Sequence, residues 1–557
     1  MNLQFLKRSC VIIVLVITSI STVSSQESNF KKYVKINGNV SATAIFYNAR
    51  SIEPRKDPFS YILSGNLNVT VLGTSLPFSF TVSNRNSKFR QPFNQFGFSP
   101  SYKWITLHLG YRNIKFDPLV MNGHQLLGVG VELNPGIFRF GFIWGRFKRE
   151  INVAHTVGEP HIDSVQQFTR KGYSVKLGIG NKKNFFDLIF LQVADDTLSL
   201  ENYNPDNTMP ASGNTALGLN TRLQFTQKLF FELSTAYSLY TTNLSGYPLV
   251  ENNDKFYMKL VPPINSSTEH YYAIKSALTY QPGKHTTLSL NYRRIQPGYK
   301  TMGMYFIQSD AENITMNMSF AFWKNKIHLS GSVGTERNNL NKARESTTRR
   351  WVGSANLNFA PTRSFSLTAN YANFSINQRG DEVQIADSVK LYQTNSQLSF
   401  MPRYIVFGKK VNHVFMFMFN SSQLKDKNPY TSEFTDFHLT NYMFTYNVNF
   451  MPSAFGVTAT YNYAKVNMVT GKNTNQTISL GLNKSLLKRK LLLRFNQLFT
   501  FANNNNQHTT LIRPAFTAIY KPARHHQFKF HFIYKKNKAE VNDFSETTVD
   551  ISYLFTY

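Results

Sequence analysis

The sequence is poor in several features that usually reveal a function. It has one cysteine, Cys10, so the chain after this N-terminal residue has no disulfide and no cysteine metal site. After residue 25 it has no apolar run of about 18 residues, which excludes helical membrane spans. It also lacks Pro/Ser-rich linkers and blocks of like charge. We therefore expect residues 26–557 to form one domain.

Motifs for catalysis are missing as well. There is no Gly-x-Ser-x-Gly nucleophile elbow and no His-Glu-x-x-His zinc motif. The neighbouring His525 and His526 are expected in a turn, on opposite faces, which disfavours a metal site with His531. We therefore predict no catalytic residue, no metal and no cofactor.

The N-terminus indicates export. Met1 to Ser25 contains Lys7 and Arg8, a short apolar run from 11 to 17, and small residues before Gln26. A positive start, a short apolar core and small residues at the end are typical of a secretory signal peptide. The run is too short for a membrane anchor. We predict that residues 1–25 are a signal peptide.

The chain is strongly basic and rich in aromatic residues. The chain has 61 Lys and Arg against 31 Asp and Glu, a formal net charge of +30, which favours polyanionic partners. An exported chain seldom meets nucleic acid, so we expect the phosphates of lipopolysaccharide in an outer membrane and no nucleic acid. Aromatic residues make up 15% of the chain while its mean hydropathy is negative. This combination fits strands that are apolar on one face only.

Strict alternation recurs along the chain. In "NYMFTYNVNF" the residues Tyr442, Phe444 and Tyr446 share one face, while Thr445 and Asn447 share the other. The segments "KLFFELSTAYSLY" and "QFKFHFIYK" repeat the pattern. This is the period of a β-strand, and segments of roughly 9–14 residues are long enough to cross a bilayer at a tilt.

The connections between these segments also alternate in length. Short turns are expected near 73–77, 100–103, 134–136, 182–183, 227–228, 282–284, 324–326, 361–363, 408–410, 452–453, 487–490 and 522–524. Longer polar segments lie near 49–59, 150–167, 197–215, 244–268, 299–310, 338–348, 379–390 and 424–435. Twelve hairpins plus strands near 33–48 and 546–557 predict about 26 strands, with 24 as the alternative because the strand at 94–100 is weak. The pattern predicts an all-β, antiparallel, up-and-down transmembrane β-barrel with short periplasmic turns and long extracellular loops.

The last residues, "TTVDISYLFTY", end in alternation on an aromatic residue. With Tyr553, Phe555 and Tyr557 on one face, this end resembles that of the outer-membrane β-barrel proteins of Gram-negative bacteria, at the level of pattern over the mature chain. The resemblance implies that the final strand closes the barrel against the first. It also implies that these three residues are read by the barrel assembly machinery.

A barrel of this size needs something in its lumen. The first strand is expected soon after residue 25, which leaves no room for an N-terminal plug, so inward-folded loops such as 197–215 and 244–268 or a separate plug or lipoprotein partner should block it. Basic residues that alternate with lipid-facing aromatics are expected to line the lumen: Arg139, Arg293, Arg350, Arg494, Lys529 and His531. A basic, amide-rich lining favours polar or anionic solutes.

Three functions remain open. The first is a pore or transport component. The second is a structural or secretion-related platform for a periplasmic or lipoprotein partner, which would bind at a basic rim formed by turns such as Lys409-Lys410 and Lys488-Arg489-Lys490. The third is a lipid-modifying enzyme of the outer membrane, for which the sequence offers no motif.

Overall fold

The fold was analysed in a computed structural model of the chain. It describes residues 34–71, 74–84, 95–151, 166–200, 209–249, 261, 263–343, 346–380, 392–428, 431–469, 471–505, 507–539 and 543–557. The predicted signal peptide at 1–25 lies outside the described residues.

The described residues form 27 strand segments and the short helix α3 (Ser432–Thr435). In the first half of the chain the strands are β1 (Val34–Arg50), β2 (Phe59–Val71), β3 (Thr74–Ser83), β4 (Gln95–Phe98), β5 (Ser101–Tyr102), β6 (Ile105–Asn113), β7 (Gln125–Leu133), β8 (Phe138–Lys148), β9 (Thr169–Gly180), β10 (Phe185–Asp196), β11 (Gly213–Gln224), β12 (Leu229–Thr241), β13 (Thr268–Gly283) and β14 (Thr286–Ile295). The second half holds β15 (Ala311–Phe322), β16 (Ile327–Arg337), β17 (Ser346–Phe359), β18 (Phe365–Gly380), β19 (Tyr392–Phe407), β20 (Val411–Asp426), β21 (Phe437–Phe450), β22 (Phe455–Met468), β23 (Gly471–Leu486), β24 (Leu491–Asn504), β25 (Gln507–Tyr520), β26 (His526–Ala539) and β27 (Phe544–Thr556). In the part of the chain with assigned structure, no helix is long and apolar enough to cross a membrane.

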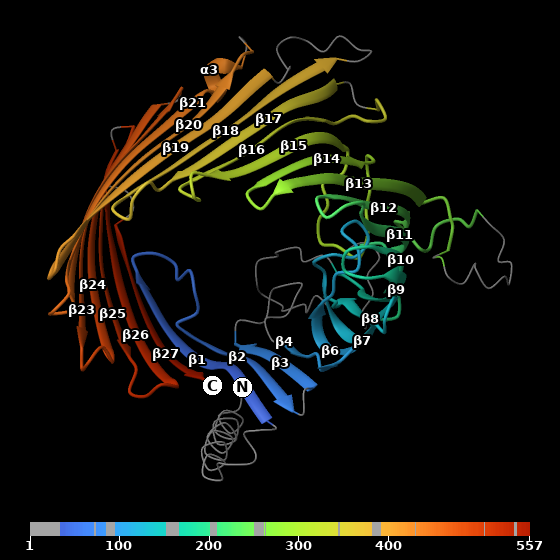
Figure 1. The fold of residues 1–557 in the computed structure, drawn as a ribbon, viewed down its shortest axis with the longest axis horizontal. Helices are drawn as coiled ribbons and strands as arrows, with labels where there is room; N and C mark the ends of the chain where they lie inside the picture. Colours follow the sequence, from blue (N-terminus) through green and yellow to red (C-terminus); the bar gives the residue numbers. More distant parts are fainter. Residues whose placement is uncertain are drawn as a thin grey trace.

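The strands close into one antiparallel barrel, as predicted (Figure 1). β4 and β5 both pair with β3 and β6, so they are two pieces of one interrupted strand, and the barrel has 26 strands. This interruption is the weak strand expected at 94–100. The first and last strands pair from Asn39↔Thr556 to Arg50↔Ser545, which closes the cylinder. The backbone amide of Tyr557 continues this pairing with a 2.9 Å bond to the Gly38 carbonyl.

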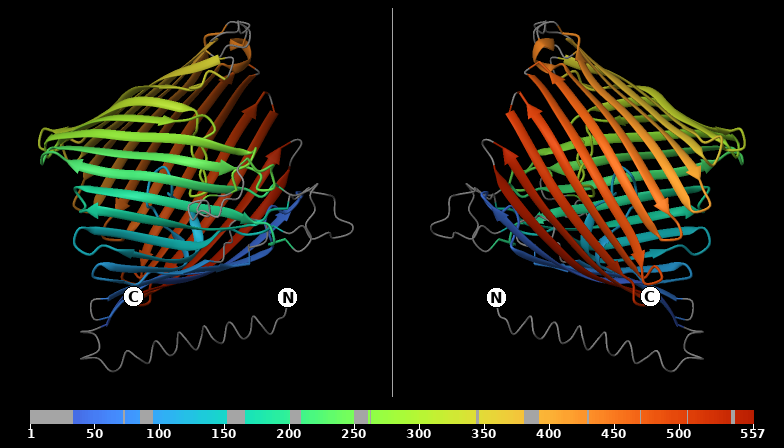
Figure 2. Two further views of the ribbon diagram at one scale, coloured as in Figure 1. Left: turned by 90° about the vertical axis from the view of Figure 1, so that its right-hand side faces the viewer. Right: turned by 90° about the vertical axis from the view of Figure 1, so that its left-hand side faces the viewer.

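All twelve predicted short turns join consecutive strands at one end of the barrel. The opposite end carries the longer loops, although the last three of these connections, after β22, β24 and β26, are also short. Figure 2 shows that the strands slope differently around the barrel: β21–β27, in orange and red, are steep, whereas the green strands lie almost level. The same alternating sequence pattern therefore forms strands of two different inclinations.

The outer surface is apolar. Phe444, Tyr461, Leu480 and Ile551 on four strands are between 45% and 50% exposed, and the residues between them along each strand point inward. An apolar outer surface around a closed barrel is the arrangement that lipid requires, because no strand edge is left unpaired.

Part of the interior is a hydrophobic core, which the sequence pattern did not predict. Two segments, 114–124 between β6 and β7 and 296–310 between β14 and β15, pack against the inner face of the strands between them (Figure 1). Their residues Val120 and Met121 are fully buried, together with Ile189 and Leu191 of β10. The central parts of the predicted inward loops 197–215 and 244–268 lie outside the described residues.

Candidate functional site: the lining of the lumen

The lumen has two unlike walls. We call the inner face of β7–β14 with the segments 114–124 and 296–310 the covered wall, and the inner face of β20–β27 the bare wall. Alternation with exposed apolar residues identifies the inward positions on each strand. The strands of both walls therefore alternate in the same way. The walls differ in which side chains point inward and in whether a segment covers them.

Asp117 fixes the first covering segment. Its Oδ2 accepts a 2.6 Å hydrogen bond from Ser234 Oγ on β12, and its Oδ1 accepts bonds from the backbone amides of Leu119 (2.6 Å) and Val120 (2.8 Å). The carboxyl is fully buried, and this burial raises the pKa of Asp117 despite the three donors. The segment 114–124 is thus tied to the barrel wall through one carboxylate.

The two covering segments also bind each other. The carbonyl of Leu119 accepts a 2.8 Å bond from Tyr299 Oη, and that of Val120 accepts a 3.0 Å bond from Thr301 Oγ1. Gly303 passes so close to Val120 that a Cβ at Gly303 would collide with the Val120 carbonyl oxygen. Only glycine permits this approach.

Asn214 of β11 holds the second segment. It is fully buried, and its Oδ1 accepts a 3.0 Å bond from the Met302 amide while its Nδ2 donates to Ser238 Oγ at 2.7 Å. Ser238 Oγ in turn donates to the Lys300 carbonyl at 2.7 Å. The polar atoms that this contact buries on Asn214 and Ser238 therefore have partners, which is what burial of polar groups requires.

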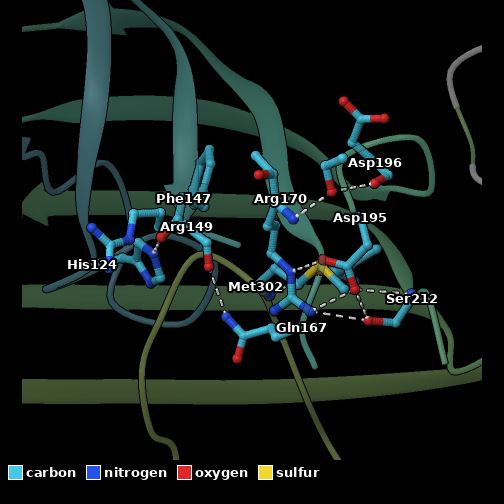
Figure 3. Close-up of polar contacts among 12 residues, drawn as sticks. His124, Phe147, Arg149, Gln167, Arg170, Asp195, Asp196, Ser212 and Met302 are labelled. Carbon is cyan, nitrogen blue, oxygen red and sulfur yellow. Dashed lines mark hydrogen bonds and ion pairs between the residues drawn. The ribbon is translucent and has the colours of Figure 1, made fainter. Parts of the chain in front are cut away.

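Ion pairs surround the covered core. Arg139 binds Asp187 with two bonds of 2.7 and 2.9 Å, and the Asp187 side chain is only 2% exposed. Arg170 binds Asp195 in the same two-pronged way, and Ser212 completes the cluster (Figure 3). Lys176 and His108 share Glu132 at 3.0 and 3.2 Å. Of these cations, only Arg139 was among the predicted lining residues, and its charge is neutralised by Asp187.

His124 ends the first covering segment between the aromatic residues Phe147 and Tyr305. Its Nε2 donates a 2.9 Å bond to the Phe147 carbonyl, and its ring stacks on Tyr305 with 4.3 Å between centroids. The Nδ1 atom is buried without a partner among the described residues. Burial lowers the pKa of His124, and the nearby Arg170 guanidinium lowers it further. The imidazole therefore favours its neutral form.

A hollow of about 460 Å³ lies beside His124, on the lumen side of the covered wall. Its lining includes Arg170, Lys300, Tyr299 and Tyr305, which combine cations with phenol rings. Lys300 also lies over the Tyr240 ring at 5.4 Å. The hollow is therefore basic and aromatic, although Asp195 neutralises Arg170.

The predicted residues Arg293 and Arg350 come together at the loop end of the barrel. Both contact Glu336 of β16, at 3.6 Å each. Gln308 from the second covering segment donates to Glu336 Oε1 at 3.3 Å and accepts from Arg293 at 3.3 Å. Asp310 lines the same hollow as Glu336 and Arg350, so arginines and carboxylates are mixed in this part of the lining.

Several inward cations of the bare wall have no partner among the described residues, although Lys535 of β26 pairs with Glu546 of β27 at 3.0 Å. Arg494 and Lys529, both predicted, make no hydrogen bond or ion pair within the described part of the chain. His531 bonds Thr517 Oγ1 at 2.8 Å and stands opposite Asp550 in the strand register. Arg494 pairs in register with the same Thr517, so these side chains form one row across β24–β27.

The inward cations include residues that were not among the predicted ones. Arg403 of β19 and Arg513 of β25 alternate with outward residues and have no partner within the described residues. The same period-two signal that pointed to Arg494 could have found both. Between the two walls, β15–β19 present a polar hollow of about 550 Å³, lined by side chains such as Asn317, Ser354 and Ser399.

The predicted C-terminal residues lie at the closing strand. Tyr553 Oη is 2.8 Å from His526 Nδ1, and the Phe555 and Tyr557 rings meet edge to face at 4.7 Å. Their reading by the assembly machinery stays a prediction.

Comparison with known proteins adds little detail. No family model and no curated protein matches the sequence. Among solved structures, the chain is similar to OccAB4 of Acinetobacter baumannii, with 11% identity over 95% of this chain and 100% of that one and a TM-score of 0.29. It is also similar to OpdK of Pseudomonas aeruginosa, solved with vanillate, with 10% identity, 94% and 99% coverage and a TM-score of 0.31. A BenF-like porin from Pseudomonas fluorescens Pf-5 is similar as well, with 10% identity over 94% of this chain and 99% of that one and a TM-score of 0.30.

The class of the protein follows from its own geometry. A closed antiparallel barrel with an apolar outer face, short turns at one end and longer loops at the other is an integral β-barrel of the Gram-negative outer membrane.

Proposed function

We propose that the protein is an outer-membrane pore that passes polar solutes with a preference for anions. The observation that carries the proposal is the bare wall, where Arg494, Arg513 and Lys529 face the lumen without a carboxylate partner among the described residues. Fixed cations along a polar surface attract anions and repel cations. The covering segments narrow the lumen from the other side and leave this surface as the solute path.

The amide- and hydroxyl-rich surface supports polar cargo. The hollow at β15–β19 is bordered by cross-strand contacts such as Ser332–Ser354 at 2.7 Å and Asn370–Ser399 at 3.0 Å. Such groups exchange hydrogen bonds with water or with solute hydroxyls. The vanillate in the OpdK structure belongs to that protein and leaves the cargo of this chain open.

Single-channel recording in planar bilayers under a salt gradient tests the proposal. We expect steady openings with an anion-selective reversal potential. In the variant Arg494→Gln/Arg513→Gln/Lys529→Gln the openings should persist while the anion preference falls. A control variant on the outer face, Arg294→Gln, removes a single charge and should leave the reversal potential unchanged. A folded barrel that never conducts, or one whose selectivity ignores the triple substitution, would contradict the proposal.

A platform for a periplasmic partner is the second candidate, supported by the basic turns. Lys182-Lys183, Lys409-Lys410 and Lys488-Arg489-Lys490 all lie at the short-turn end of the barrel. An acidic periplasmic domain would be attracted to such a rim. Gentle extraction followed by mass spectrometry would reveal a stoichiometric partner, and a barrel that conducts alone and purifies alone would exclude this role.

A further inference from the structure

Three pairs of adjacent charged residues stand at the loop end of β14, β16 and β17: Arg293-Arg294, Glu336-Arg337 and Arg349-Arg350. Because successive side chains in a strand point to opposite faces, each pair sends one charge inward and one outward. Arg293, Glu336 and Arg350 meet in the lumen. The other member of each pair therefore lies on the outer surface.

The outward residues form one continuous row. In the strand register Arg294 stands opposite Glu312 of β15, Glu312 opposite Arg337, and Arg337 opposite Arg349. Glu312 accepts a 3.0 Å bond from Arg294 Nη1 and a bond from Arg337 Nε. Tyr292 Oη also donates to Glu312 at 2.9 Å, so this single carboxylate already serves three donors.

The row has an excess of positive charge. It contains three guanidinium groups and one carboxylate, and Arg349 has no partner among the described residues. Arg337 and Arg349 stand directly opposite each other, and like charges in such cross-strand positions repel unless an anion lies between them. This excess of guanidinium groups favours an anionic ligand on the outer side of the row.

The position of the row specifies which anion could bind there. Two residues farther from the loop end, the same strands expose Ile314 and Trp351, with Trp351 66% exposed, and Val333 is exposed four residues from Arg337. These belong to the apolar surface that contacts lipid chains, and an outward tryptophan is typical of the membrane interface. The arginines therefore lie just beyond the lipid chains, at the level of the headgroups of the outer leaflet.

We propose that Arg294, Arg337 and Arg349 bind the phosphate groups of a phosphorylated glycolipid in the outer leaflet, the lipid A part of lipopolysaccharide. Guanidinium groups match phosphate oxygens with paired hydrogen bonds. One phosphate between Arg337 and Arg349 removes their repulsion, while the acyl chains of the same molecule lie along Trp351 and Val333. The site requires the barrel to be in the outer membrane, and it is independent of what passes through the lumen.

The charge pairs supply a matched control for the test. The variant Arg294→Gln/Arg349→Gln removes two outward charges, and Arg293→Gln/Arg350→Gln removes two inward charges from neighbouring positions on the same strands. Both change the net charge equally, so a non-specific loss of attraction would affect them alike. Heat-modifiable migration in gel electrophoresis would check that both variants fold.

Native mass spectrometry of the purified barrels with bis-phosphorylated lipid A measures the binding. We expect the natural protein and the inward variant to retain lipid A and the outward variant to lose about tenfold in affinity, as expected for losing charge-assisted bonds. Dephosphorylated lipid A should bind the natural protein as weakly as lipid A binds the outward variant.

Equal retention by the two variants, or equal binding of phosphorylated and dephosphorylated lipid A, would overturn the site. Binding of inorganic phosphate alone as tightly as lipid A would also overturn it, because the arginines would then select a free anion and not a lipid.

Discussion

The covered and bare walls of the barrel are built from the same alternating strands, yet charges buried on the covered wall are paired while several partly or fully exposed cations of the bare wall are not. On the covered wall Arg139 is bound to a buried carboxylate, and Asp117 anchors a whole segment. On the bare wall Arg494 and Lys529 have no partner within the described residues. The difference shows that burial, and not the strand pattern, decides whether an inward charge is structural or available to solutes.

The largest effect should come from a charge placed under the cover. Val120→Asp buries an unpaired carboxylate at a fully buried position, beside Gly218 of β11 and Gly303. Docking of segment 114–124 should weaken by at least about 4 kcal/mol, so the segment should leave the wall. Single-channel conductance should then rise. The control Ala515→Asp, at an inward position of the bare wall, should change stability by about 1 kcal/mol or less. Equal conductance in both variants would contradict the proposed difference between the covered and bare walls.

An intermediate effect is expected from removing a paired arginine. Arg139→Gln leaves the Asp187 carboxylate buried without its cation, which should lower the free energy of unfolding by about 3 kcal/mol. Arg494→Gln removes an unpaired cation and should stay within about 0.5 kcal/mol of the natural protein. Urea unfolding in lipid vesicles measures both. Similar losses of unfolding free energy in the two variants would mean that inward arginines contribute equally to stability on the two walls.

The smallest effect should be a response to acid through His124. Because its pKa is lowered, the folded state prefers the neutral ring. The stability that this provides is present above the ordinary pKa of histidine and is lost as the pH falls through the lowered value. Docking of segment 114–124 should therefore loosen at a pH below the ordinary histidine pKa of about 6.5, and single-channel conductance should increase there.

The effect of pH on stability through Asp117 is opposite to that through His124, so the contributions of the two groups can be distinguished. Its raised pKa means that its contribution to stability is present at low pH and is lost as the pH rises through the raised value. Acid should therefore tighten the segment at Asp117 and loosen it at His124. The variant His124→Phe should abolish the acid-induced increase in conductance. If the increase persists in His124→Phe, the response belongs to another group.

Strand positions could be predicted because they depend on local alternation. The outward row Tyr442, Phe444 and Tyr446 and the inward Arg494 follow from the period of two residues alone. The closing pair β1 and β27 followed from the aromatic C-terminus. Even the weak strand near residue 97 could be anticipated, since its apolar alternation is short.

The covering segments could not be predicted in the same way, because their burial depends on residues far apart in the sequence. Val120 lies beside Gly218 of β11 and Gly303, in a core that includes β10, and no local pattern connects these elements. A signal was nevertheless present in β10. Its run "DLIFLQV" is apolar on both faces, since Ile189 and Leu191 alternate with Leu188 and Phe190. Strands that are apolar on both faces are covered on both faces, and this excess predicts a covering element without identifying it.

The paired charges at the loop end have a consequence for assembly. A strand that pairs one residue out of place exchanges its inward and outward side chains. For β17 such a slip would exchange Arg349 with Arg350, which leaves the charge on each side of the rim unchanged. The same slip would turn the exposed Trp351 into the lumen and Ser354 toward the lipid. At β17 the rim charges therefore do not distinguish the correct register from a one-residue slip, and the register of this strand is specified by the apolar belt next to them.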